Sequence, residues 1–279
     1  MNDNIYNSSW ERYCKRFVAF LDIAGFKAMC NQHIEDDGYI HDILNHNAIL
    51  SKLEQSNHEN LREYLYILNI SDSIIVISKD DSEMALSCLT LAVGEIFNYT
   101  FVQAPINGAI AHGLMSVDIE KNIFFGQAYN LAYMLQEQMD YYGIVCDSSV
   151  EEYLQRISPD SLLHNVFVKI QSYFKGEKES KPKACVNYIW FDSLKFGTIS
   201  YTAAQNFVRD KDLSELPLAD ENGVVCGTYE ERIGATINRH YSKCDEKSRG
   251  KIGRRLNNTM QSIKDLLCRY RDNHHKCRV

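Results

Sequence analysis

The first apolar run of the chain predicts a buried strand that ends in a turn. Residues 16–26 read Arg-Phe-Val-Ala-Phe-Leu-Asp-Ile-Ala-Gly-Phe, so one carboxylate, Asp22, interrupts an otherwise apolar stretch. Apolar runs of aromatic and branched residues that stop at a glycine are typical of strands inside a sheet. Residues 27–53 then repeat apolar positions at helical spacing, which predicts two helices separated near residues 36–38.

Two shorter apolar runs predict a β-hairpin. Residues 64–70 and 74–78 are separated only by Ser71-Asp72-Ser73, a polar break of turn-forming residues. If the first strand lies beside this hairpin in one sheet, the carboxylates of Asp22 and Asp72 project into the same cleft.

The rest of the pattern alternates helices with strands. Helices are predicted over 82–99 and 127–139, and strands over 106–112, 123–125, 143–146, 166–170 and 184–191. This order predicts an α/β (α+β) sandwich with a mixed sheet and helices on one face. After about residue 192 strand patterns become sparse, and helices are predicted over 229–241 and 247–270. We therefore expect a first domain of residues 1–192 and a C-terminal helical extension of residues 193–279.

Composition narrows the class of protein. The chain has 279 residues, of which 45% are hydrophobic and 24% charged, as in a globular protein with a substantial core. Its nine cysteines form no CxxC pair, which favours reduced thiols in the cytoplasm. No apolar stretch is long enough for a membrane helix, and the N-terminus has no apolar signal region. The histidines, His112 included, lack metal-ligand spacing and are interpreted as core or surface residues.

The charge is unevenly distributed. The net charge is −7, yet residues 245–279 carry ten Lys/Arg against four Asp/Glu. The remaining body is strongly acidic, which argues against nucleic acid as a partner. We interpret the basic tail as a solvated helix face.

Asp22 and Asp72 are the candidate metal ligands. Each has an ordinary interpretation, Asp22 as a cap at the end of a strand and Asp72 as a turn residue. As a pair in one cleft, however, they offer the hard oxygen ligands that Mg²⁺ or Mn²⁺ prefers, with positions left for substrate phosphates.

The sequence around these residues resembles a known family. Phe-Leu-Asp-Ile-Ala-Gly-Phe at residues 20–26 resembles the first metal motif of the class III adenylyl and guanylyl cyclases, and Ser71-Asp72 resembles the second. Three further segments are similar to the strand, helix and hairpin motifs of that family, in the same order: residues 109–113, 126–132 and 174–176. The resemblance covers residues 14–192 and implies the ferredoxin-type sandwich of these enzymes.

The resemblance implies a role for each matching residue. Two Mn²⁺ or Mg²⁺ ions would be bound by Asp22, Asp72 and the carbonyl of Ile23, while Asn130 would orient the ribose and Lys175 the terminal phosphates. The amides of Ala24, Gly25 and Phe26 would cradle phosphate oxygens. The family's reaction is attack of the ribose 3′-oxygen on the α-phosphorus with loss of pyrophosphate. Its active form is a homodimer.

Three positions depart from the purine cyclases. Leu68 and Ile123 stand where adenylyl cyclases have a base-reading Lys and Asp, and Met134 replaces the helix arginine. The guanine-reading residues are missing as well. This combination is similar to the pyrimidine cyclases of bacterial Pycsar anti-phage systems, which implies conversion of UTP to cyclic UMP and a separate effector that the cyclic nucleotide activates. A cytidylate cyclase and a catalytically silent nucleotide-binding or dimerisation module are the alternatives.

Overall fold

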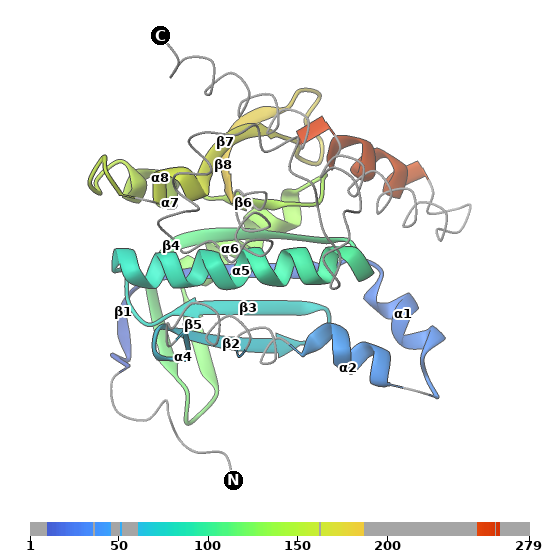
Figure 1. The fold of residues 1–279 in the computed structure, drawn as a ribbon, viewed down its shortest axis with the longest axis horizontal. Helices are drawn as coiled ribbons and strands as arrows, with labels where there is room; N and C mark the ends of the chain where they lie inside the picture. Colours follow the sequence, from blue (N-terminus) through green and yellow to red (C-terminus); the bar gives the residue numbers. More distant parts are fainter. Residues whose placement is uncertain are drawn as a thin grey trace, which may run out of the picture. The chain divides into compact units, whose positions relative to one another are not determined.

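The structure is a computed structural model that describes residues 10–35, 37–45, 51, 61–161, 163–186, 250–259 and 261–262. The chain forms two compact units, Met1–Gln138 with Gly143–His164, and Met139–Tyr142 with Asn165–Val279. Each unit is described by itself (Figure 1). The predicted domain boundary near residue 192 falls outside the described residues and stays a prediction.

The first unit is built on a mixed sheet with strand order β2-β3-β1-β4-β6, and β5 pairs with the far end of β4. Its strands are β1 (Tyr13–Ile23), β2 (Leu65–Ile70), β3 (Ser73–Ser78), β4 (Ile106–Asp118), β5 (Ile123–Gly126) and β6 (Ile144–Cys146). All neighbours are antiparallel except β4 and β6. The order β4-β1-β3-β2 is the ferredoxin-type arrangement, so the predicted fold class is confirmed.

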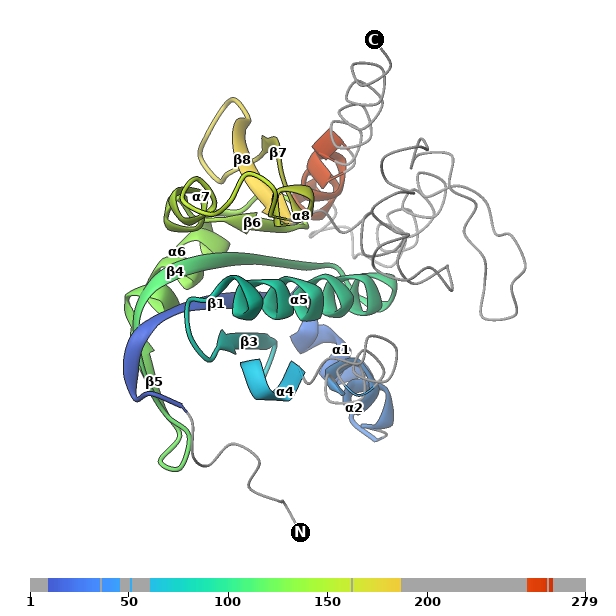
Figure 2. The same ribbon diagram turned by 60° about the vertical axis from the view of Figure 1, so that its left-hand side comes forward.

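Helices connect these strands, both where they were predicted and at positions for which no helix was predicted. They are α1 (Phe26–Gln32), α2 (Gly38–Leu44), α4 (Leu61–Tyr64), α5 (Glu83–Gln103), α6 (Gln127–Gln138), α7 (Ser148–Leu154) and α8 (Leu163–Val166). The break between α1 and α2 confirms the interruption predicted at residues 36–38. Figure 2 shows β1 and β4 side by side and bending together toward β5.

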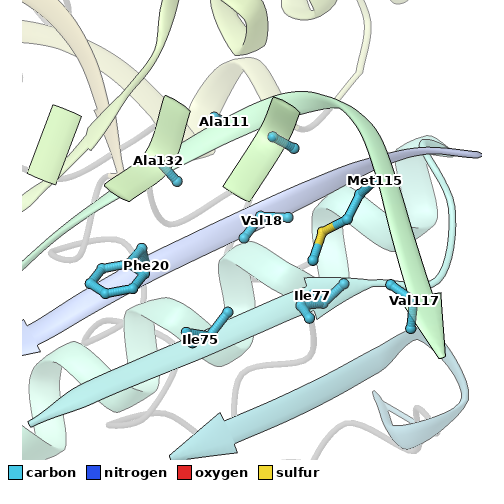
Figure 3. Close-up of a cluster of buried hydrophobic side chains, with 9 residues drawn as sticks. Val18, Phe20, Ile75, Ile77, Ala111, Met115, Val117 and Ala132 are labelled. Atoms are coloured by element: carbon cyan, nitrogen blue, oxygen red, sulfur yellow. The ribbon is translucent and has the colours of Figure 1, made fainter. Parts of the chain in front are cut away.

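Helices cover both faces of the sheet, and the prediction of one covered face is wrong. On one face, Val18 and Phe20 of β1 pack with Ala128 and Ala132 of α6 in a buried cluster. Figure 3 shows this cluster with α5 behind the sheet. Successive strand residues point to opposite faces, so the buried residues between them, such as Ala19, face α5. A strand whose residues are apolar without alternating with polar ones is typically covered on both faces of the sheet.

Local capping explains where two helices begin. Ser82 precedes α5, and its hydroxyl accepts a 3.2 Å hydrogen bond from the amide of Ala85. Asp147 precedes α7 and accepts a 2.9 Å bond from the amide of Ser149. We did not predict α7, although an aspartate followed by Ser-Ser-Val-Glu-Glu is an N-terminal capping signal.

The second unit contains the hairpin of β7 (Phe167–Ser172) and β8 (Lys181–Val186) and a C-terminal helix (residues 250–259 and 261–262). The described part of the helix predicted over residues 247–270 is thus confirmed. The helix predicted over 229–241 lies outside the described residues. Within the described parts of the chain, no helix has the length and apolarity needed to cross a membrane.

Candidate active site

Asp22 and Asp72 lie at neighbouring ends of two paired strands. Asp22 is the penultimate residue of β1 and pairs with Ser73, the first residue of β3. Asp72 occupies the β2–β3 turn, directly before Ser73, and the amide of Ile23 donates a 2.9 Å hydrogen bond to the Asp72 carbonyl. The structure therefore confirms that the first strand lies beside the hairpin. Both aspartates are partly exposed.

A row of polar residues crosses the sheet at Asp22. Directly paired residues of antiparallel strands point to the same face, so Ser73, Asp22 and Asn107 form one row. Asn107 is fully buried, and its Nδ2 donates to the carbonyl of Gln136 on α6 at 3.5 Å. This row thus faces α6. Sequence reasoning missed Asn107, although a polar residue within an apolar strand is a signal of a site.

The turn after β1 is shaped by Gly25. Its φ of 78° lies in the left-handed region, which glycine enters without steric cost, and its carbonyl accepts from the amides of Ala28 and Met29. The amide of Ala24 donates to the carbonyl of Pro105 at 2.8 Å, so binding phosphate there would require breaking that bond. The amides of Gly25 and Phe26 stand at the start of α1, where helix amides have no acceptor within the helix.

Asn130 lies on the side of α6 that faces away from the sheet. The buried side of this helix is formed by Ala128, Ala132 and Gln136, spaced four residues apart. Asn130 is two residues beyond Ala128, a rotation of about 200° around the helix axis. Asn130 and Met134 are both exposed, one turn apart on this outer stripe. The structure therefore does not turn Asn130 toward Asp22 of the same chain.

Leu68 and Ile123 differ in their surroundings. Leu68 lies in the row of Ile75 and Phe20, one row from Asp22, and packs against the buried cluster. Rows on one face are two residues apart, about 7 Å along the strand. Ile123 is exposed on β5. The neighbouring Asn69 donates through Nδ2 to the carbonyl of Leu44 at 2.9 Å.

Aromatic rings line the same face beside Leu68. The Phe20 ring makes edge-to-face contacts with Tyr129 and Tyr133 of α6, at centroid distances of 5.8 and 5.3 Å. Burial, with a smaller effect of Tyr133, raises the pKa of the Tyr129 hydroxyl. The hydroxyl of Tyr129 is thus a neutral hydrogen-bonding group at neutral pH.

Lys175 belongs to the second unit, in the connection between β7 and β8. It is exposed, and Gly176 after it has a φ of 80°. The lysine thus stands at a tight turn, as predicted for the hairpin. Whether it joins the aspartates at one site stays a prediction.

His112 is a core histidine. The residue is 7% exposed, and its ring centroid lies 4.8 Å from that of Phe17 and 5.4 Å from that of Tyr153. Its Nε2 is 3.2 Å from Oδ2 of Asp81. Burial lowers the pKa of the imidazole, and the hydrogen bond to Asp81 opposes that shift. Burial chiefly raises the pKa of Tyr153 to about 12. His112 pairs with Phe17 near the middle of β1, away from the row of Asp22.

A metal site shared by Asp22 and Asp72 stays a prediction. Among the described residues, no group of three or more His, Cys, Asp or Glu side chains is placed to hold a metal. Two carboxylates and a carbonyl leave coordination positions for phosphate oxygens and water, which is how Mg²⁺ is commonly bound with nucleotides. The oxygen donors at Asp22 and Asp72 therefore fit Mg²⁺ or Mn²⁺.

Comparisons with known proteins find a likeness to solved structures. No family model and no curated protein matches the chain. The chain is similar to a bacterial light-regulated adenylyl cyclase, with a TM-score of 0.41 and 10% identity over 64% of this chain and 92% of that one. It is similar to the catalytic core of a rhodopsin-guanylyl cyclase with converted specificity in complex with ATPαS. The TM-score is 0.44 and the identity 14%, over 64% of this chain and 98% of that one. It is also similar to the adenylyl cyclase CyaB from P. aeruginosa, with a TM-score of 0.39 and 17% identity over 62% of this chain and 94% of that one. Identities this low leave the function to be inferred from the site.

Proposed function

We propose that this protein is a nucleotidyl cyclase that converts a pyrimidine nucleoside triphosphate, UTP ahead of CTP, into its 3′,5′-cyclic monophosphate. The observation that carries the proposal is the pair of aspartates, held at adjacent strand ends by the bond from Ile23 to Asp72. The motifs that resemble class III cyclases place the same two residues as metal ligands.

The reaction forms one phosphorus–oxygen bond and breaks another. The ribose 3′-hydroxyl loses its proton, its oxygen bonds the α-phosphorus, and the bond from that phosphorus to the bridging oxygen breaks to release pyrophosphate. Asp22 and Asp72 would hold the divalent ions, whose positive charge would stabilise the attacking and leaving oxygens. In the proposed roles, Lys175 binds the terminal phosphates and Asn130 holds the ribose.

A homodimer would complete the site. Asn130 faces outward from α6, whereas Asp22 belongs to a row that faces this helix. A two-fold pairing of identical chains would bring Asn130 and Lys175 of one protomer to Asp22 and Asp72 of the other and generate two equivalent sites. Exposed Met134 and Phe125 provide apolar area for such a pairing.

The pyrimidine preference rests on Leu68. Its apolar side chain lies one row from Asp22, between the buried cluster and the site. Leu68 stands where the resemblance places a base-reading lysine, and its branched apolar side chain fills space beside Asp22 without a hydrogen-bonding group for a purine. Leu68 and Ile123 together stand in place of both polar residues with which adenylyl cyclases read adenine. Cyclic UMP would then activate a separate effector in anti-phage defence.

One assay tests the proposal. Purified protein is incubated with each of the four NTPs and Mn²⁺, and cyclic products are identified by mass. We expect cyclic UMP as the main product, with cyclic CMP next. Dominant cyclic AMP or cyclic GMP would contradict the pyrimidine assignment.

A silent nucleotide-binding module is the second candidate, because Met134 replaces the arginine expected to stabilise the transition state. Tight nucleotide binding without pyrophosphate release from any NTP would establish it. Asp22→Asn serves as the inactive control in the same assay.

A further inference from the structure

Asp140, just after α6, is bound by an arginine from the C-terminal helix. Arg254 donates from Nε to Oδ2 at 2.7 Å and from Nη2 to Oδ1 at 3.2 Å. The Asp140 side chain is 8% exposed. These bonds raise the pKa of the Arg254 guanidinium. The paired bonds fix the direction of both side chains, which a single contact would not do.

The same helix binds backbone groups around Asp140. Arg255 Nη2 donates to the Met139 carbonyl (3.1 Å), Asn258 Nδ2 donates to the Asp140 carbonyl (2.9 Å), and Thr259 Oγ1 accepts from the Tyr142 amide (2.8 Å). Segment Met139–Tyr142 has no helix or strand of its own to satisfy these groups. Its conformation is therefore set by helix side chains 114 to 118 residues away in sequence.

The other side of this segment holds the strand that leads to Lys175. The amide of Asp140 donates to the carbonyl of Tyr173 at 2.9 Å, and Met139 forms a β-bridge with Phe174, the residue before Lys175. The hydroxyl of buried Tyr141 lies 3.0 Å from Oγ of Ser172. Segment Met139–Tyr142 thus joins the C-terminal helix to the Lys175 turn.

The helix also contacts β7 directly. Ser262 is fully buried and donates from Oγ to the carbonyl of Gln171 at 2.8 Å. Two independent connections therefore run from the helix to the hairpin that carries Lys175.

We propose that Asp140 and Arg254 are positioning residues, which make the C-terminal helix part of the phosphate-binding apparatus by fixing the Lys175 hairpin. This inference rests on the proposed function, in which Lys175 holds the terminal phosphates. A lysine on an exposed turn loses conformational freedom when it binds an anion, and a turn fixed beforehand lowers that cost. The helix thereby sets the affinity for triphosphate while remaining apart from the reacting atoms.

The variants are Arg254→Gln, Arg254→Lys and Lys251→Gln, the last an exposed residue of the same helix that serves as a matched control. Hydrogen exchange of the amides in residues 172–177 reports the order of the turn without requiring activity. Steady-state kinetics with UTP separate KM from kcat, and inhibition by pyrophosphate measures phosphate affinity directly.

We expect Arg254→Gln to speed exchange in residues 172–177 and to raise both KM and the pyrophosphate inhibition constant about tenfold, equivalent to about 1.4 kcal/mol, with a smaller change in kcat. Arg254→Lys should change exchange, KM and the inhibition constant less than Arg254→Gln does, since lysine keeps the charge but not the paired geometry. Lys251→Gln should behave as wild type.

Unchanged exchange and KM in Arg254→Gln, or equal changes in Lys251→Gln, would overturn the inference. If the wild-type protein produces no cyclic nucleotide, the proposed function fails. Exchange and pyrophosphate binding then decide the positioning role on their own, and faster exchange without weaker pyrophosphate binding overturns it.

Discussion

The backbone amide of Ile23 donates a 2.9 Å hydrogen bond to the carbonyl oxygen of Asp72. This bond joins the end of β1 to the β2–β3 turn, so the residues that carry the two carboxylates move together. An intramolecular hydrogen bond of this kind contributes about 1 kcal/mol, and here it acts between segments about 50 residues apart in the chain.

Asp22→Asn and Asp72→Asn should each lower kcat with UTP by more than about 100-fold, because losing a charged ligand costs more than the 10–100-fold typical of residues that merely orient one. Circular dichroism and thermal unfolding should show a folded protein. Asp160→Asn, on an exposed loop of the same unit, is the control and should keep full activity. Near-normal turnover in either site variant would remove the metal assignment.

Mixing two inactive variants tests the dimer. Asp22→Asn and Lys175→Ala should together restore about one quarter of wild-type activity, because random pairing makes half of the dimers mixed and each mixed dimer has one intact site. Mixing Asp22→Asn with Asp72→Asn should restore nothing, since both changes affect the same half of the site. Absence of rescue after demonstrated subunit exchange would indicate that each site lies within one chain.

Leu68→Ala should admit purines. Removing three carbon atoms from the row beside Asp22 is expected to raise the ratio of kcat/KM for ATP to that for UTP by about tenfold or more, within the range that a few methylene groups discriminate. Leu114→Ala, a partly exposed leucine on β4, is the control and should leave the ratio unchanged. An unaltered ratio in Leu68→Ala would show that the base is read elsewhere.

The burial of His112 should make the protein acid-sensitive. A histidine whose pKa is lowered by folding contributes stability above its unfolded pKa of about 6.5, and this stability is lost as the pH falls below that value. We expect the free energy of unfolding to fall between pH 7 and 5, by at most about 1.4 kcal/mol per pH unit from this group.

Urea unfolding of wild type and His112→Gln at several pH values measures this effect. The free energy of unfolding should fall less steeply with decreasing pH in His112→Gln than in wild type. It should fall as in wild type in His164→Gln, where the substituted histidine is exposed. Parallel slopes for wild type and His112→Gln would assign the acid sensitivity to other groups.

The strands of the central sheet could be predicted because the sequence pattern of each one is local. The run at residues 16–26 and the break at Ser71-Asp72-Ser73 each specify an element within a dozen residues. The extent of β4 was underestimated, since it continues six residues past His112 to Asp118 through Gly113. Pairing of β4 with β1 and β5 supports that extension, and pairing is not visible in a local pattern.

The candidate site was predicted less completely than the fold. Motif resemblance pointed to Asp22, Asp72 and Asn130, but the direction of Asn130 depends on how α6 packs. Asn107 is visible in the sequence as a polar residue within an apolar strand, but its place opposite Asp22 follows only from the register of β1 and β4. The bond between Asp140 and Arg254 joins positions 114 residues apart, and neither residue stands in a motif.

The hydrogen bonds from Arg254 to Asp140 have a consequence for synthesis of the chain. Asp140 leaves the ribosome 114 residues before Arg254, an interval on the order of ten seconds at ordinary rates of translation. Within that interval the β7–β8 hairpin is completed at Val186, before the helix that contacts it has been made. We therefore expect the hairpin to lack its contacts with the helix until residues 250–259 have been synthesised.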